Sequence, residues 1–156
     1  MNNIPKFFED RIKTLLRKSL TSQFSGISIF TFHTSPEFGS LDGAKTRYIA
    51  VHAMPETCTR YPFPKYQSVI HVSVSFPADY PAAELLVSNA NAEIAAFMNT
   101  LVADNTILSE PDAIKVYKTE TTEGENDIDW DESARSEQQT ITVNFLQLEA
   151  ATPQGE

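Results

Sequence analysis

Residues 82–104, AAELLVSNANAEIAAFMNTLVAD, decide the fold of this chain. They follow residues 66–81, YQSVIHVSVSFPADYP, an alternating segment typical of a strand that stops at two prolines. Pro81 suits the first position of a helix. We therefore predict one helix over residues 81–104, with a break near 88–91 as the alternative. Its apolar stripe consists of Ala83, Leu86, Val87, Ala90, Ile94, Phe97, Met98, Leu101 and Val102.

The strand before this helix has two unlike faces. Ile70, Val72, Val74 and Phe76 alternate with His71, Ser73 and Ser75. One face of the strand should therefore lie in the core, and the other should be wet or shared with another surface.

An amphipathic helix is predicted near the start of the chain, over residues 5–23. Glu9 and Asp10 should favour its positive N-terminal end. The predicted buried stripe consists of Phe8, Ile12, Leu15, Leu16 and Leu20.

The other segments complete the order α-β-β-β-α-β-β. Further strands are expected at residues 27–34, 47–54, 112–120 and 139–149. Residues 55–66 contain three prolines and should form an extended loop or arm, and residues 121–138 should form a polar loop. This order predicts an α+β fold, a mostly antiparallel sheet of about five strands with two helices packed on one face. A single domain should cover residues 1–150, followed by a disordered tail at 151–156.

The net charge of −9 is unevenly distributed. Residues 1–66 hold nine basic and five acidic side chains, whereas residues 67–156 hold three basic and sixteen acidic ones. An acidic surface does not attract phosphates, so sequence-specific DNA binding is not expected. No apolar run is long enough to span a membrane, the N-terminus does not resemble a signal peptide, and the single cysteine excludes an internal disulfide. These features favour a cytosolic origin.

Candidate catalytic and metal-binding residues are few. His33, His52 and His71 fall on three different predicted strands, but their spacing does not enforce the convergence that a zinc site needs. Cys58 has no local base that would activate its thiol.

An acidic segment resembles a calcium loop only in part. Asp127, Asp129 and Asp131 alternate, but Glu132 stands where glycine permits the turn and Gln138 stands where a bidentate Glu closes the site. Phosphate-loop, nucleophile-elbow and HExxH patterns are absent from the sequence. We therefore expect no enzyme, no cofactor and no metal.

Two families carry a strand similar to residues 66–77. The order helix, GISI, YIAVHAMP and VSVSFPADYP resembles the first part of ubiquitin-conjugating folds, over about residues 5–81. That family continues with another strand, a His-Pro-Asn motif and a catalytic cysteine. This sequence has no such motif, and its one cysteine precedes the strand, so this resemblance implies a non-catalytic, RWD-like protein-binding module.

The chain more closely resembles the phage tail-terminator family, the minor tail proteins of lambda-like phages. The similarity runs over roughly residues 5–148. It includes the strand YQSVIHVSVSFPA, a helix directly after a proline, an acidic turn with an aromatic (DIDWDESA) and the last strand SEQQTITVNFLQL. The conformation of residues 82–88 separates the two resemblances, because a helix fits the phage family and a strand fits the conjugating fold.

The phage resemblance implies a structural virion protein, made in the host cytoplasm. It implies a closed ring of copies, expected to be a hexamer, on the last ring of the tail tube. The ring would stop tube polymerisation and dock to the head connector protein, and DNA would pass through it without specific binding. Tail tube protein, connector protein and further copies of the chain are the implied partners.

Two segments are candidates for contacts in such a ring. Tyr61, Phe63 and Tyr66 lie in a proline-stiffened arm, which we expect to pack on a neighbouring subunit or on the tube protein, with folding back over its own sheet as the alternative. A run of seven acidic side chains within 13 residues could face the lumen and repel DNA, with a solvated outer loop as the alternative: Glu120, Glu123, Glu125, Asp127, Asp129, Asp131 and Glu132.

Overall fold

The computed structural model describes residues 3–121, 128–130 and 133–148. Two α-helices, two short 3-10 helices and seven strands make up this part of the chain. The helical elements are α1 (Ile4–Ser19), α2 (Ala83–Ala103), η1 (Pro36–Ser40) and η2 (Asn105–Leu108). The strands are β1 (Ile29–Thr31), β2 (Tyr48–Ala53), β3 (Thr57–Thr59), β4 (Lys65–Pro77), β5 (Ile114–Thr121), β6 (Ile128–Trp130) and β7 (Ala134–Gln147).

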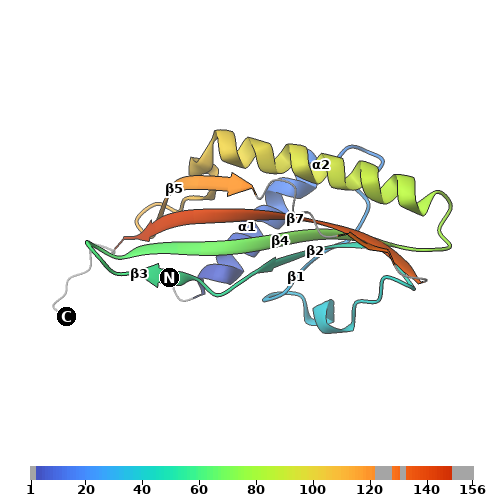
Figure 1. Ribbon diagram of the computed structural model, residues 1–156, viewed down its shortest axis with the longest axis horizontal. Coiled ribbons are helices and arrows are strands. Elements are labelled where there is room, and N and C mark those ends of the chain that lie inside the picture. Colours follow the sequence, from blue (N-terminus) through green and yellow to red (C-terminus); the bar gives the residue numbers. More distant parts are fainter. Residues whose placement is uncertain (1–2, 122–127, 131–132, 149–156) are drawn as a thin grey trace.

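One twisted sheet organises the molecule, in the order β1-β2-β4-β7-β5. Only the β1–β2 pair is parallel. The short strands β3 and β6 extend the sheet by pairing with β4 and β7. Both α-helices pack against the same face of the sheet (Figure 1). The predicted α+β class, with two helices on one face of a mostly antiparallel sheet, is therefore confirmed.

Helix α1 begins with a complete cap. The Asn3 side chain accepts a hydrogen bond from the Lys6 backbone N–H, and Pro5 occupies the first turn. Phe8, Ile12 and Leu16 are fully buried against the sheet, which contributes about 1.5–3 kcal/mol for each side chain. The helix ends at Ser19 rather than near residue 23, and Leu20 still packs into the core from the turn that follows.

Helix α2 confirms the prediction that residues after Pro81 are helical. It continues through residues 88–91 without a break. The predicted stripe is buried except at two positions, because Leu86 is half-buried and Val102 is exposed. At its start, Ala82 has a positive φ of 60° and no side chain caps the first turn.

Strands β4 and β7 form the long central ribbon of the sheet. They pair antiparallel from Tyr66 opposite Phe145 to Pro77 opposite Ala134. Ile70, Val72, Val74 and Phe76 are fully buried under the helices, as the alternation predicted. On the other face, His71 and Ser73 are half-buried, while Ser75 is buried. Neither of the described α-helices lies on that face, which we call the uncovered face, although Phe32 and Phe38 pack on its β2 side against His52.

The structure corrects the predicted strand boundaries at both ends of the chain. Residues 27–34 contain only the three-residue strand β1, since the chain turns immediately after Thr31. Residues 121–138 are not simply a loop, because Ile128–Trp130 pair with β7 and β7 begins at Ala134. Polar side chains concealed the start of β7, because backbone pairing does not depend on apolar character, and β6 is only three residues long within an acidic segment.

The proline-containing segment also differs from its prediction. Thr57–Thr59 pair antiparallel with Lys65–Gln67, so residues 55–66 form a β-hairpin rather than an extended loop. The prolines permit this pairing because Pro55 precedes β3, while Pro62 and Pro64 lie in the turn and are not required to donate to the ladder.

Candidate functional site

The hairpin formed by β3 and the start of β4 presents the most exposed aromatic side chain of the described residues. Its turn, Arg60 to Pro64, which we call the hairpin tip, contains a cis Tyr61–Pro62 bond. Tyr61 is 87% exposed and Phe63 is 49% exposed. The Lys65 Nζ lies 5.0 Å from the centre of the Phe63 ring. The tip therefore offers two aromatic rings and the Arg60 side chain to solvent, with the half-buried Lys65 beside it.

Tyr66 lies differently from the other two predicted arm residues. Its ring stacks on Phe145 with the ring centres 5.6 Å apart, so it belongs to the hairpin base and packs on its own sheet. Partial burial raises the pKa of the Tyr66 hydroxyl above its usual value, and the neighbouring Cys58 adds to this effect. Of the two arrangements expected for the arm, folding back over its own sheet describes Tyr66, whereas Tyr61 and Phe63 project into solvent.

A hollow of about 210 Å³ lies beside the hairpin on the uncovered face. Tyr117 borders it from β5, where a β-bulge between Val116 and Lys118 turns this side chain outward to 44% exposure. Gln67 and Asn144 border it from the central ribbon and are hydrogen-bonded to each other at 3.1 Å. Aromatic rings and amides thus surround the base of the hairpin.

Cys58 lies on strand β3, directly opposite Tyr66, and is exposed. It is therefore a strand residue rather than the loop residue that the sequence predicted. The prolines around it suggested a loop, but none of them occupies the three paired positions.

The three histidines are brought closer together than their sequence spacing required. His52 and His71 lie directly opposite each other on β2 and β4. The His33 ring, just after β1, lies 6.3 Å from the His52 ring. Burial lowers the pKa of His52, an effect that nearby Glu9 opposes. Within residues 3–121, 128–130 and 133–148, no three His, Cys, Asp or Glu side chains are grouped so that they could hold a metal ion.

Each histidine already has a neighbour within the protein. The His33 Nδ1 lies 2.8 Å from a carboxylate oxygen of Glu9. The His52 ring stacks on Phe32 with centres 3.9 Å apart, and the His71 Nδ1 lies 2.9 Å from the Thr140 hydroxyl. This geometry favours structural roles for all three side chains.

The Glu9 side chain lies in the core, and the prediction that it faces the helix dipole is wrong. Its carboxylate is fully buried and accepts hydrogen bonds from the backbone N–H groups of His33 and Ala53, both at 2.8 Å. It therefore joins α1 to the edge where β1 ends, instead of balancing the helix dipole. Its position one residue after Phe8 and three before Ile12, on the buried stripe, was the available signal.

A second buried carboxylate, Glu137, lies between β7 and α2. It accepts hydrogen bonds from the Ser88 hydroxyl at 3.0 Å and from the Asn91 side-chain N–H at 2.9 Å. The Asn91 Oδ1 is buried without a hydrogen-bond partner. Extending the alternation of Ile141 backward along the strand would have placed Glu137 on the core face.

The predicted acidic segment is described at two of its seven positions. Glu120 is exposed on β5, opposite Thr142, and its carboxylate lies 3.6 Å from the Lys118 Nζ. Asp129 belongs to strand β6. Glu123, Glu125, Asp127, Asp131 and Glu132 lie outside the described residues, as does the predicted tail at 151–156.

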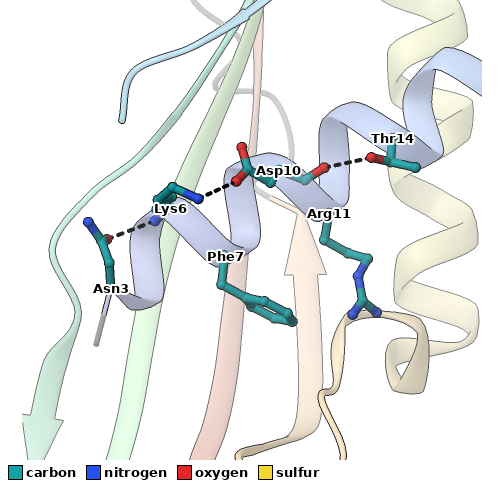
Figure 2. A pocket seen from close by; sticks show the side chains of 6 residues that line it. All are labelled: Asn3, Lys6, Phe7, Asp10, Arg11 and Thr14. Atoms are coloured by element: carbon teal, nitrogen blue, oxygen red, sulfur yellow. Dashed lines mark hydrogen bonds and ion pairs between the residues drawn. The ribbon is translucent and has the colours of Figure 1, made fainter. Parts of the chain in front are cut away.

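A groove of about 480 Å³ runs along α1 (Figure 2). Lys6 and Asp10 form an ion pair at 2.9 Å, and Thr14 donates to the Asp10 carbonyl. Arg11 donates to the Ile107 carbonyl and to Glu110. The charged groups that line the groove are thus engaged within the chain.

No protein-family model matches this sequence, and a search of curated proteins found no match. Among the described residues, no helix combines the length and the apolar character needed to cross a bilayer.

Proposed function

We propose that this chain is a structural phage protein that forms a ring at the head-proximal end of the tail tube. The ring stops further polymerisation of the tube and docks to the head connector. The mechanism is complementarity of surfaces rather than catalysis: one ring face matches the end of the tube, and the other does not continue it.

The observation that carries this proposal is helix α2, Ala83–Ala103, which starts two residues after Pro81. Strands β5 and β7 then complete the sheet beside β4. This order agrees with the tail-terminator resemblance. The ubiquitin-conjugating resemblance calls for a strand at residues 82–88, so the α2 helix gives that alternative no support.

The hairpin tip supports assembly into a ring. Exposed Tyr61 and Phe63 are large apolar side chains held by a paired and proline-containing hairpin, so little conformational freedom is lost when they become buried. Aromatic side chains of this kind are enriched at the centres of protein interfaces.

The uncovered face suits a surface past which DNA moves. Hydroxyl and amide side chains line its central ribbon, and at its β5 side the charge of Glu120 is balanced by Lys118, 3.6 Å away. Such a surface offers little to hold phosphates. We propose that this face lines the ring lumen, together with the acidic segment that the sequence carries between β5 and β7.

The ring is tested by native mass measurement and negative-stain microscopy of the purified chain, followed by tube assembly. We expect closed rings and, when the chain is added to polymerising tail tube protein of the same phage, shorter tubes that carry the chain at one end. A chain that stays monomeric at all concentrations and leaves tube length unchanged would overturn the proposal.

The lumen is tested separately, by reversing Glu120, Glu123, Glu125 and Asp127 to lysine. We expect rings to form and DNA ejection to slow, because lysines bind the passing phosphates. Unchanged ejection from intact particles would contradict the lumen position without affecting the ring.

A further inference from the structure

The two most exposed large apolar side chains of the described residues lie at opposite ends of the molecule. They are Tyr61 at 87% and Leu85 at 62%. Tyr61 is in the hairpin tip before β4, and Leu85 is in the first turn of α2, shortly after β4 ends (Figure 1). Exposed apolar groups separated in this way mark two surfaces rather than one.

The hairpin tip is the more basic of these surfaces. Arg60 is its first residue and Lys65 follows it directly. The sequence contains no acidic residue from 57 to 78. Pro62 and Pro64 have no N–H groups, so at these positions the backbone offers only carbonyl acceptors. The tip thus combines aromatic rings, positive charge and carbonyl oxygens.

A hollow of about 410 Å³ lies at the other surface, which we call the α2 hollow. It is lined by Ala78, Tyr80, Ala82, Ala83, Glu84 and Leu85.

The chemistry of the α2 hollow complements that of the tip. The Ala83 N–H is bonded to the Tyr80 carbonyl, but no side chain caps α2, so the backbone N–H groups of Glu84 and Leu85 can be offered to carbonyl oxygens. Leu85 supplies apolar surface, and the exposed Asp79 and Glu84 supply acidic groups. Two basic groups lie nearby, since Arg135 pairs with Glu84 at 3.2 Å and Arg47 lies over the Tyr80 ring.

We propose that the hairpin tip of one copy docks in the α2 hollow of the next copy. This proposal rests on the ring proposed above and supplies the contact that builds it. A head-to-tail contact between two different surfaces generates a ring when its rotation closes.

A second copy is the occupant that the geometry favours. The tip cannot reach the hollow of its own chain, because the 13 residues of β4 separate them by roughly 40 Å at about 3.3 Å per residue. Copies of net charge −9 repel one another, so contact is favoured where one copy presents its basic end. Arg60 and Lys65 would then approach Asp79 and Glu84.

The contact is tested by crosslinking single-cysteine variants made in a Cys58→Ser background. Pro64→Cys places a thiol on the tip, and Asn89→Cys places one on α2 one turn beyond Leu85, so the proposed contacting side chains remain. Mixing these two variants with a short bismaleimide should give a covalent dimer of about 35 kDa, twice the chain mass of 17.4 kDa. Replacing Asn89→Cys by Asn99→Cys, about 15 Å further along the helix, should abolish the product.

A mixing experiment tests the head-to-tail arrangement. The double variant Tyr61→Ser/Phe63→Ser removes the two aromatic rings of the tip, and Leu85→Arg blocks the α2 hollow. Each variant alone should therefore be monomeric. A mixture should form dimers and nothing larger, because each pair has one intact tip and one intact hollow. The unfolding midpoint of each variant is compared with that of the wild type, so that a folding defect is recognised.

The outcomes separate this contact from the ring itself. Rings that persist in both blocked variants, with no Pro64→Cys/Asn89→Cys product above the Asn99→Cys control, would overturn the contact and leave the ring standing. A specific Pro64→Cys/Asn89→Cys crosslink, together with a wild type that forms open filaments or dimers, would support the contact and overturn the ring.

Discussion

The two helices meet the same sheet in opposite ways. Helix α1 begins with an Asn3 cap and contributes its own buried carboxylate, Glu9, whose hydrogen bonds at the sheet edge are short. Helix α2 begins without a side-chain cap after a left-handed Ala82 and receives a carboxylate, Glu137, from β7. At this second junction the Asn91 Oδ1 has no partner.

This difference indicates which junction ties a helix to the edge of the sheet and which leaves a helix start uncapped. At α1, the Glu9 carboxylate accepts hydrogen bonds from the backbone N–H groups of His33 and Ala53, at the point where β1 ends. The edge of the sheet therefore depends on this helix. At α2, an uncapped start beside an exposed Leu85 leaves donors and apolar surface available to another molecule. The hydrogen-bonded sheet edge at α1 and the uncapped start of α2 therefore lie at separate places in the molecule.

The largest effect is expected from Glu9→Ala. Removing this carboxylate leaves two buried backbone donors and the His33 ring without their acceptor, which should cost about 3–5 kcal/mol of unfolding free energy. Urea unfolding measures the change. Asp10→Ala, at the neighbouring exposed ion pair with Lys6, should cost less than about 1 kcal/mol. Equal costs for the two variants would show that the buried carboxylate of Glu9 stabilises the α1 junction no more than an exposed ion pair does.

A smaller loss is expected from Glu137→Ala, at about 1–3 kcal/mol. This change removes the acceptor of Ser88 and Asn91, but both donors come from side chains of one helix, so no strand edge is released. The same urea measurement applies, with Glu120→Ala on the exposed side of β5 as the control. A cost above that of Glu9→Ala would reverse the proposed order of the junctions.

Ala82→Gly should stabilise the protein by about 1 kcal/mol. Glycine adopts the φ of 60° without the steric cost that Ala82 bears. Ala92→Gly, on the exposed face of the same helix, should instead destabilise by about 1 kcal/mol, because glycine is unfavourable in a helix interior. Thermal unfolding of both variants decides the point, and a loss of stability from Ala82→Gly would show that the left-handed start is not strained.

The smallest effect concerns pH. Burial lowers the pKa of His52 below 6.5, so between the two pKa values the unfolded chain binds more protons than the folded chain. This contribution to stability is present above pH 6.5 and is lost as the pH falls through the folded pKa. Unfolding free energies of wild type and His52→Gln, compared between pH 8 and pH 5.5, should show a shallower loss in the variant. A steeper loss in His52→Gln would mean that the burial effect has the opposite sign.

Periodicity along the chain was sufficient to determine the two helices, the central ribbon and their faces. Alternation placed Val72 and Phe76 in the core, and helical spacing placed Val87 and Ile94 there, because both periods depend only on local backbone geometry. The same spacing identified residues 82–88 as helical. The aromatic arm was recognisable from Tyr61 and Phe63, although its β-hairpin was not.

Only the tertiary structure decided the positions where polar groups enter the core and where strands of only three residues pair. The position of Glu9 depends on where β1 ends. Its carboxylate is hydrogen-bonded to His33 and Ala53, which are distant from it in sequence and are brought close only by the fold. The strands at 57–59 and 128–130 exist because a longer partner strand offers them hydrogen bonds. Likewise, the tip and the α2 hollow became recognisable as opposite surfaces once β4 had set their separation. A sequence pattern records the local period of burial, whereas contacts between distant segments are fixed by how the sheet is assembled.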